Sequence, residues 1–364
     1  MEITILHQSP ISNLLPQPIM NQLLKQLTEA TGVASDEKEV RLLLRDLITD
    51  HVDEWRVDAL GNLLALKKGD GSSDLRVMVD AHMDEVGLIV TNIDSDGTCQ
   101  FETIGGFDPR ALLGKVVQVG AKKHIGVIGA TPVHLLKAGE GGKVVPTSSM
   151  RIDIGAKNKD AAADLANVGD YAAFVTEYEE IGQCAIGKAF DNRAGCAALV
   201  ELLRKERYPF DLYAAFTVQE EVGLVGAKTA AFGVKPDAAL VLESTPAYDL
   251  PTKDDASPNV ALGKGPSLYV MDSQTIQDPR LVQHIVQTAV SHNIPYQIRR
   301  PGGGGTNTGN IQKAHSGVPA ATIAVPGRYA HTPTLMINLE DYANVVKLAD
   351  ATLRELKTEI VKRQ

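Results

Sequence analysis

The chain has 364 residues, of which 44% are hydrophobic and 22% are charged; this length and composition predict two folded domains, or one large domain that carries an insertion. The formal net charge of -9 argues against a nucleic-acid partner, because phosphate binding needs a basic surface. The three cysteines have no CxxC spacing, which argues against a disulfide framework or a zinc ribbon. The chain has no stretch of about 18 apolar residues that would predict a membrane span, and no basic start before an apolar run that would predict a secretory signal, so we expect a cytoplasmic protein.

The first part of the chain, residues 1–87, predicts two helices followed by strands. Residues 1–19 show no clear pattern and are expected to form a loose extension. Apolar residues then recur at helical spacing in two segments, and Ser35 is the expected N-cap of the second. Three short apolar runs follow, the last of which predicts a buried strand that ends at His82. The predicted helices cover residues 18–30 and 35–48, and the predicted strands cover 54–57, 62–67 and 75–81.

Residues 88–182 differ in character from the rest of the chain. Short apolar runs are separated by glycines and Asp-Gly turn signals, and helical periodicity is found only around 157–167. Several short strands at close spacing are typical of a small β-barrel or sandwich. We therefore predict an inserted β domain at 88–182.

Residues 183–364 return to alternating helices and strands. This alternation favours an α/β fold with a mostly parallel sheet that is covered by helices on both faces. The domain begun by residues 1–87 is then completed after the insertion. The predicted strands cover residues 212–218, 238–242 and 320–325, and the predicted helices cover 192–205, 224–232, 279–291 and 339–361.

Histidines and carboxylates follow the ends of the predicted strands. In open α/β sheets, ligands bind beyond the carboxyl ends of the strands, so these side chains are expected to meet in one patch. They are His82 and Asp84 after 75–81, Glu220 and Glu221 after 212–218, Glu243 after 238–242, His331 after 320–325, and Asp191 at the start of helix 192–205.

Such a patch needs cations, because clustered carboxylates cannot all ionise in a partly buried site without compensation. Mixed histidine and carboxylate ligation suits zinc, cobalt or manganese, and a carboxylate can bridge two metals about 3.5–4 Å apart. We expect two divalent metal ions per subunit. If Glu221 ligates a metal, its neighbour Glu220 is free to act as a general base on metal-activated water, and Asp84 can orient the ring of His82.

Four segments resemble the signatures of the glutamyl (tetrahedral) aminopeptidase family of co-catalytic two-metal metallopeptidases. The resemblance covers nearly the whole chain from about Met20, in the family's order and spacing. The segments are VDAHMDEVG at 79–87, FDNRAG at 190–195, VQEEVG at 218–223 and RYAHTP at 328–333.

The resemblance implies an aminopeptidase that removes the N-terminal residue from peptides, with a hydroxide bridging the two metals as the nucleophile. It also implies an inserted β domain and assembly into twelve-subunit tetrahedral particles. The implied ligands are His82, Asp191 and Glu243 at one metal and Asp191, Glu221 and His331 at the other, with Asp191 as the bridge and Glu220 as the base.

Two residues depart from the family's pattern. Glu243 stands where the family usually has Asp, and Asn307 stands where the usual Gly-Thr-Asp-Ala-Gly run has its carboxylate. The glycine run before it, 302–305, is expected to be a structural loop, with Thr306 capping the next helix. Two rival readings stay open: an amide deacylase or other amidohydrolase that uses the same metals, and a non-catalytic, metal-stabilised assembly protein.

The preferred N-terminal residue of the substrate is also left open by the sequence. Four arginines could each select an acidic side chain, or each could be structural. They are Arg110, Arg299, Arg300 and Arg328.

Overall fold

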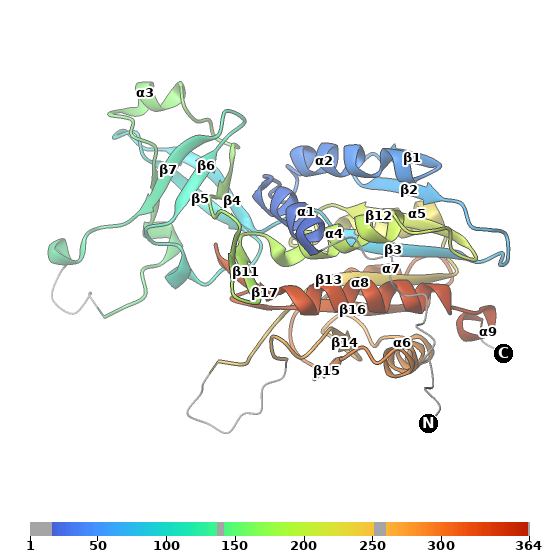
Figure 1. Cartoon of the computed structure of the whole chain (residues 1–364). Coiled ribbons are helices and arrows are strands. Elements are labelled where there is room, and N and C mark those ends of the chain that lie inside the picture. The colour runs from blue at the N-terminus through green and yellow to red at the C-terminus, as the bar shows by residue number, and fades with distance from the viewer. Residues whose placement is uncertain (1–16, 137–141, 251–259, 363–364) are drawn as a thin grey trace.

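The structure, a computed structural model, describes residues 17–136, 142–250 and 260–362. Figure 1 shows a large α/β body and, at one end of it, a smaller β-barrel. This architecture confirms the predicted fold class of a helix-covered sheet with a barrel inserted into it. No helix in the described ranges has both the length and the apolar character that crossing a bilayer would require.

The large sheet is mixed rather than mostly parallel as predicted, because antiparallel pairings flank its parallel centre. Its main strand order is β1-β2-β12-β3-β13-β16-β17-β11-β10, with β14 pairing with β16 and β15 pairing with β14. The four central strands β12, β3, β13 and β16 are parallel, whereas the flanking pairs are antiparallel. The strands are β1 (Glu54–Val57), β2 (Leu63–Lys67), β3 (Arg76–His82), β10 (Glu179–Ile181), β11 (Cys184–Gly187), β12 (Asp211–Thr217), β13 (Ala238–Pro246), β14 (Ser267–Tyr269), β15 (Gln297–Arg299), β16 (Ala320–Arg328) and β17 (Leu335–Asn338).

The register of the central strands brings their carboxyl ends to one level. Thr217 in β12 lies opposite His82 in β3, and Val241 in β13 lies opposite Asp80 in β3. Glu243, two residues beyond Val241, is therefore level with His82. These strands are almost entirely buried, which explains why they read in the sequence as continuous apolar runs.

Helices cover both faces of the sheet. One core cluster joins α1, α2, α4, α6 and α8 to one face, and a second joins α5 and α7 to the other. The helices of the large body are α1 (Gln17–Glu29), α2 (Lys38–Ile48), α4 (Phe190–Leu203), α5 (Val225–Val234), α6 (Pro279–Ser291), α7 (Thr308–Ile311), α8 (Leu339–Arg354) and α9 (Thr358–Val361). Within the described ranges, short 3-10 helices lie at Thr49–His51, Pro109–Ala111, Val133–Leu135 and Thr147–Ser149.

Helix α4 is the central buried helix and it carries a site residue at its start. Every residue of α4 except Asp191 is buried. Gly195 allows the helix to pass close to β13, because a Cβ at this position would collide with the Asn192 side chain and the Leu242 carbonyl. Close packing of α4 against the sheet thus fixes where Asp191 emerges.

Three local predictions are wrong. Ser35 does not cap α2: it has a φ of 77°, and its amide donates to the Glu37 carboxylate. The last predicted helix is interrupted after Arg354, so that α8 and α9 are separate. Residues 17–19 belong to α1 rather than to a loose extension, and residues 1–16 of that predicted extension lie outside the described residues.

The barrel is closed and antiparallel, in the order β4-β5-β8-β7-β6-β9. Its own apolar core includes Leu88, Val90, Phe101 and Ile152. Strand β10 lies within the range 88–182 that the sequence assigns to the insertion, but it pairs with β11 in the large sheet. The barrel elements are β4 (Gly87–Ile93), β5 (Cys99–Ile104), β6 (Val116–Val119), β7 (His124–Gly129), β8 (Arg151–Asp153), β9 (Tyr171–Phe174) and the short helix α3 (Lys159–Ala163).

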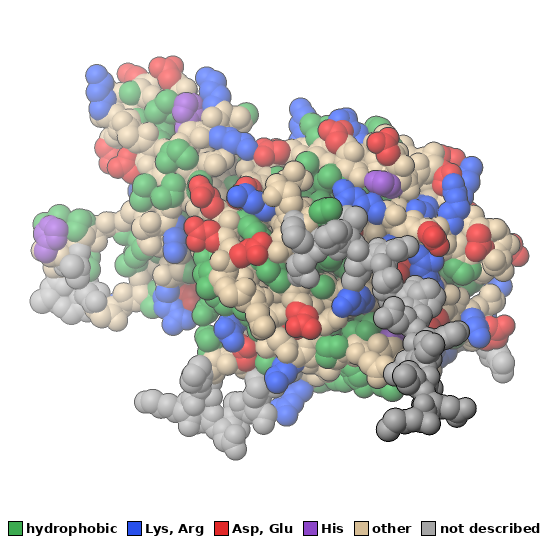
Figure 2. All heavy atoms as spheres, viewed as in Figure 1, with side chains coloured by type: hydrophobic (Ala, Val, Ile, Leu, Met, Phe, Trp, Pro, Cys, Tyr) green, Lys and Arg blue, Asp and Glu red, His purple; other side chains and the backbone are tan. Residues whose placement is uncertain are grey.

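The surface of the large body carries both signs of charge. On the face seen in Figure 2, acidic and basic side chains are interspersed, with apolar side chains between them. This mixed pattern is the ordinary surface of a folded protein with a modest net negative charge.

Candidate metal centre

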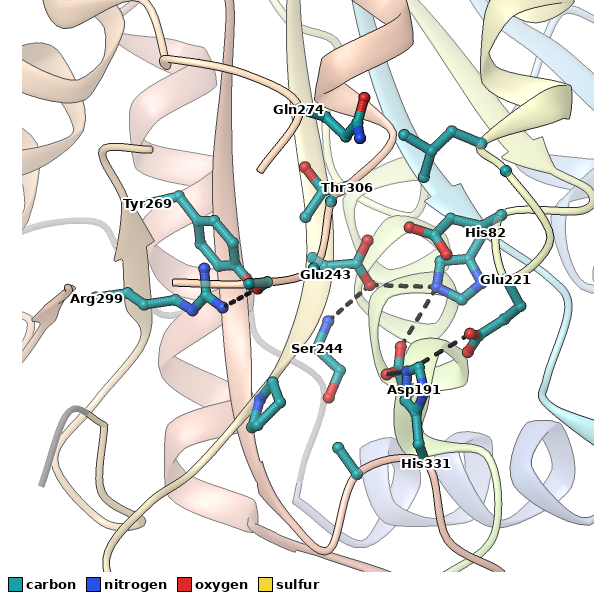
Figure 3. A pocket seen from close by; sticks show the side chains of 18 of the residues that line it. His82, Asp191, Glu221, Glu243, Ser244, Tyr269, Gln274, Arg299, Thr306 and His331 are labelled. Carbon is teal, nitrogen blue, oxygen red and sulfur yellow. Dashed lines mark hydrogen bonds and ion pairs between the residues drawn. The ribbon is translucent and has the colours of Figure 1, made fainter. Parts of the chain in front are cut away.

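The carboxyl ends of the central strands line a cavity of about 560 Å³. Six of the seven residues singled out from the sequence line it, and the seventh, Asp84, lies beneath it. Figure 3 shows five of these side chains pointing toward one another from β3, α4, β13 and the loops after β12 and β16, namely His82, Asp191, Glu243, Glu221 and His331. The six lining residues are His82, Asp191, Glu220, Glu221, Glu243 and His331.

His82 is the most buried of them, with 1% of its surface exposed. Its Nε2 lies 3.3 Å from Asp191 Oδ1 and 3.3 Å from Glu243 Oε1. Its Nδ1 lies 3.1 Å from the carbonyl oxygen of Asp84 and 3.4 Å from the carboxylate of the same residue. One ring nitrogen of His82 therefore faces the cavity, while Asp84 holds the other.

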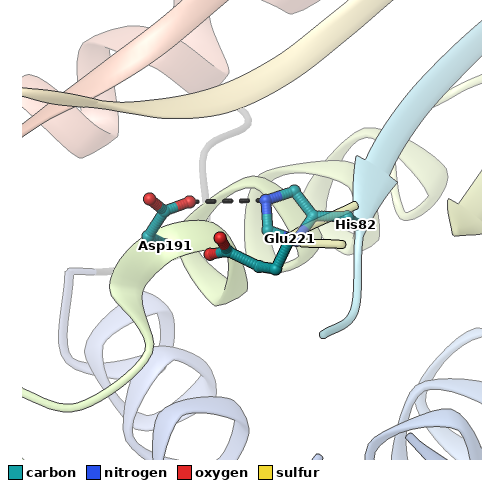
Figure 4. A group of neighbouring side chains, drawn as sticks. All are labelled: His82, Asp191 and Glu221. Atoms are coloured by element: carbon teal, nitrogen blue, oxygen red, sulfur yellow. Dashed lines mark ion pairs between the residues drawn. The ribbon is translucent and has the colours of Figure 1, made fainter. Parts of the chain in front are cut away.

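Asp191 lies between the two histidines. Its Oδ1 faces His82, and its Oδ2 lies 3.7 Å from His331 Nε2. Asp191 has φ −83° and ψ 102°, outside the helical region, and its side chain does not cap α4. The carboxylate is therefore free to point toward the cavity that it lines, and Figure 4 shows it turned toward His82, with Glu221 beside them.

His331 reaches the site from the loop after β16 and is held by the barrel side of the molecule. Its Nε2 lies 3.5 Å from Glu221 Oε2, and its Nδ1 lies 3.0 Å from the carbonyl oxygen of Gly106. Gly106 follows β5 of the barrel. The barrel thus contributes directly to the orientation of a side chain in the cavity, although 43% of the His331 side chain remains exposed.

The adjacent glutamates are held by the carboxylate of Asp84. Its two oxygens accept hydrogen bonds from the backbone amides of Glu220 and Glu221, each at 3.0 Å. The ligand atoms of His82, Asp191 and Glu221 lie within 4.8 Å of one another, and so do those of His82, Glu220 and Glu243. Glu220 therefore reaches the same small volume as the residues expected to ligate.

The electrostatics of this cluster favour cation binding. Burial raises the pKa of Glu220 and Glu221 well above the usual value, and the neighbouring carboxylates add to the effect. Burial alone would lower the pKa of His82, but the charge of Glu243 and the contacts with Asp191 and Asp84 raise it well above its usual value. The group thus needs positive charge, which protons or metal ions can supply.

The donor set fits divalent metal ions. Glu243 Oε1 accepts from the Ser244 amide, whereas Glu243 Oε2 is buried and has no hydrogen-bond partner among the described residues. Buried carboxylate oxygens are normally paired, so this one calls for a ligand. Carboxylate oxygens together with the Nε2 atoms of two histidines are ligands suited to zinc, cobalt or manganese.

Asn307 lies beneath the cavity, against a carboxylate that sequence reasoning missed. Its Nδ2 donates to Asp80 Oδ2 at 2.8 Å and to Thr217 Oγ1 at 2.9 Å. Burial raises the pKa of Asp80 to about 7. The sequence signal that could have identified Asp80 is the presence of an acidic residue inside the apolar run 75–81. The predicted cap at Thr306 is wrong, because this hydroxyl donates instead to Asp272.

A profile of the M42 glutamyl aminopeptidase family matches residues 61–348. A putative aminopeptidase of Acetivibrio thermocellus is 40% identical, over 90% of this chain and 97% of its own. The lysyl aminopeptidase of Pyrococcus furiosus is 33% identical over 92% and 97% of the two chains, and the glutamyl aminopeptidase of Lactococcus lactis is 32% identical over 93% and 96%.

Solved structures agree with these matches. A TET aminopeptidase from a marine-sediment archaeon of the Thaumarchaeota superposes with a TM-score of 0.91 at 35% identity, over 94% of this chain and 98% of its own. The TET1 peptidase of Pyrococcus horikoshii superposes with a TM-score of 0.83 at 34% identity, over 93% and 100% of the two chains. The chain therefore belongs to the M42 glutamyl aminopeptidase family and is a peptidase.

Proposed function

We propose that this protein removes the N-terminal residue of peptides with the help of two divalent metal ions. One ion would be held by His82, Asp191 and Glu243, and the other by Asp191, Glu221 and His331. The observation that carries this proposal is the position of Asp191, which turns one carboxylate oxygen toward each histidine. A carboxylate shared in this way is the usual bridge of a two-metal site.

When bound, such ions polarise a substrate carbonyl and acidify water. The residues of this chain then have separate tasks. Glu220 takes the proton of the attacking water and returns it to the departing amine, because its carboxylate reaches the same small volume as the ligands without being one of them. Asp84 orients both the His82 ring, through its contact with Nδ1, and the backbone of Glu220 and Glu221, through hydrogen bonds from their amides.

We further propose that the protein is a cytoplasmic homo-oligomer, with residues 88–182 apart from β10 as its assembly domain, and residues 1–87 and 183–364 together with β10 as the catalytic domain. This proposal is supported by the TET1 peptidase of Pyrococcus horikoshii, which can assemble into a tetrahedron or a large octahedral shell. The ligand types of the site accept zinc, cobalt or manganese.

The test is the variant Glu220→Gln, compared with the wild type after loading with zinc, cobalt or manganese. We expect the variant to retain two metal ions per subunit by elemental analysis. Its kcat for aminoacyl p-nitroanilides should fall by about 100-fold or more, because the proton acceptor is lost. Wild-type turnover of N-acylated substrates but not free-amine substrates would instead indicate an amide deacylase, and full activity of the variant would refute the role of Glu220.

A further inference from the structure

Arg299 lines the cavity but has no task in the chemistry proposed above. Among the described residues that line the cavity, the basic side chains are His82, His331 and Arg299. The two histidines face carboxylates at the metal centre. Arg299 is thus the one lining residue in the described ranges that carries a permanent positive charge.

The guanidinium of Arg299 is fixed by its neighbours. Arg299 in β15 lies opposite Tyr269 in β14, and its guanidinium stacks over the tyrosine ring at 4.5 Å from the ring centre. Tyr269 is itself held by a hydrogen bond to Thr245 at 3.0 Å. In the view of Figure 3, Arg299 and Tyr269 reach into the cavity from β15 and β14, with Glu243 between them and His82.

The hydrogen-bonding capacity of Arg299 is largely unused. Its Nη2 donates to the Gly303 carbonyl at 3.0 Å, whereas Nε and Nη1 are buried and have no partner among the described residues. Only 5% of the residue is exposed. A buried guanidinium without a matching acceptor is costly, and a planar carboxylate is the group that its donors fit best.

The other arginines considered in the sequence do not offer this arrangement. Arg110 is on the barrel and pairs with Asp108, and Arg328 pairs with Asp249 through two hydrogen bonds. Neither these two nor Arg300 is among the residues that line the cavity.

The local distribution of charge points the same way. The permanent positive charge of Arg299 stands apart from the histidines of the metal centre, so its part of the cavity would attract an anionic rather than a cationic side chain.

We propose that Arg299 binds the side-chain carboxylate of an acidic N-terminal residue, which makes this protein selective for peptides that begin with Glu or Asp. Family membership leaves this open, because a lysyl and a glutamyl aminopeptidase are almost equally similar to the chain. The proposal rests on the proposed aminopeptidase function and names the substrate class of that same site.

The experiment compares p-nitroanilides of Glu, Asp, Leu and Lys, because these substrates lack the carboxylate of a peptide C-terminus. The wild type should show the highest kcat/KM with Glu or Asp. Arg299→Gln should lower kcat/KM for the acidic substrates by about 100-fold or more and change the Leu substrate by less than about threefold, since only the former lose a charged partner. Arg299→Lys keeps the charge but loses the planar fork, so we expect an intermediate loss.

Arg110→Gln is the matched control, because it removes an exposed arginine of the barrel that already has an acidic partner. It should leave the ratio of acidic to neutral turnover unchanged. Equal use of Leu, Lys and Glu by the wild type would overturn the selectivity while leaving the aminopeptidase function intact. A uniform loss on dipeptides with an unchanged nitroanilide ratio would mean that Arg299 holds the peptide C-terminus, which also overturns it.

A binding measurement tests the role of Arg299 independently of the proposed aminopeptidase activity. In the Glu220→Gln background, calorimetry should show glutamyl p-nitroanilide binding at least about 10-fold more tightly than the leucyl compound. Adding Arg299→Gln should abolish this difference. If no free-amine substrate were hydrolysed by the wild type, the proposed function would fail, yet the binding preference would still decide the role of Arg299.

Discussion

At the scale of single residues, the site depends on carboxylates held by other groups rather than by solvent. Asp191 faces two histidines, Asp84 accepts two backbone amides, and Asp80 accepts from the side chains of Thr217 and Asn307. Each of these buried carboxylates is stable in its ionised form only where its neighbours are hydrogen-bond donors or cations. The departure at Asn307 is therefore understood through its partner, because an amide there can donate to Asp80 and a second carboxylate could not.

This pairing predicts that the carboxylate and the amide can exchange places. Asn307→Asp alone would set two acceptors 2.8 Å apart in a buried site, and we expect it to cost about 2–4 kcal/mol of unfolding free energy at pH 8. Asp80→Asn combined with Asn307→Asp restores one donor and one acceptor and should recover at least half of that loss. Denaturant unfolding of the three metal-free proteins measures this; an additive double variant would contradict the pairing.

Some site residues could be predicted from the sequence and others could not. His82, Glu220, Glu221 and Glu243 could be found because each follows an apolar run that ends a buried strand. Arg299 could not be selected from four candidate arginines, because its significance lies in which partners it lacks. Only the folded arrangement reveals that Arg110 and Arg328 are already paired.

At the scale of elements, the turn between β12 and α5 is supported from the opposite side by α2. Glu37, at the N-terminus of α2, accepts hydrogen bonds from the amides of Ser35 at 2.8 Å and Gln219 at 3.2 Å. Gln219 has a φ of 57° and immediately precedes Glu220. The loop before α2 and the turn that carries the proposed base are thus tied together by one buried carboxylate.

Burial and the nearby Asp84 raise the pKa of Glu37 to about 7. The folded state then holds a proton that the unfolded state releases near its ordinary pKa, so stability falls as pH rises from about 4.5 to about 7 and is level above that. We expect Glu37 to contribute about 2–3 kcal/mol of this fall in the metal-free protein. Glu37→Gln should flatten the corresponding part of a plot of unfolding free energy against pH, and an unchanged slope would contradict this assignment.

Strands that are buried on both faces were the easiest elements to predict from the sequence. Helix caps and strand pairings that depend on tertiary contacts were the hardest. The central strands are apolar along their whole length, so their positions followed from the sequence. Ser35 and Thr306 were predicted as caps because they precede helices and carry hydroxyls. In the fold, the Ser35 amide donates a hydrogen bond to the Glu37 carboxylate, and the Thr306 hydroxyl donates one to the Asp272 carboxylate. Strand β10 reads like its barrel neighbours, yet it pairs with β11 because its hairpin is local.

At the scale of the whole molecule, the barrel is joined to the catalytic chemistry and also presents apolar residues outward. The Gly106 carbonyl contacts His331, which connects the barrel to the cavity. On strand β7, Ile125 and Val127 are 56% and 42% exposed and lie two residues apart, so both side chains project from the same outer face of the barrel. These two adjacent apolar side chains make this face of β7 the place to test for contact with another protein chain.

If the barrel assembles the proposed homo-oligomer, charges on this face should break the assembly without unfolding the subunit. We expect the wild type to be a large particle by light scattering, and the double variant Ile125→Asp with Val127→Asp to be smaller by at least a factor of two in mass. Both side chains are exposed in the subunit, so its far-UV circular dichroism should be unchanged. Ile19→Asp replaces another exposed apolar side chain, on α1, and serves as the control that should leave the mass unaltered. A wild-type monomer, or a variant of undiminished mass, would show that this face of β7 does not hold the particle together.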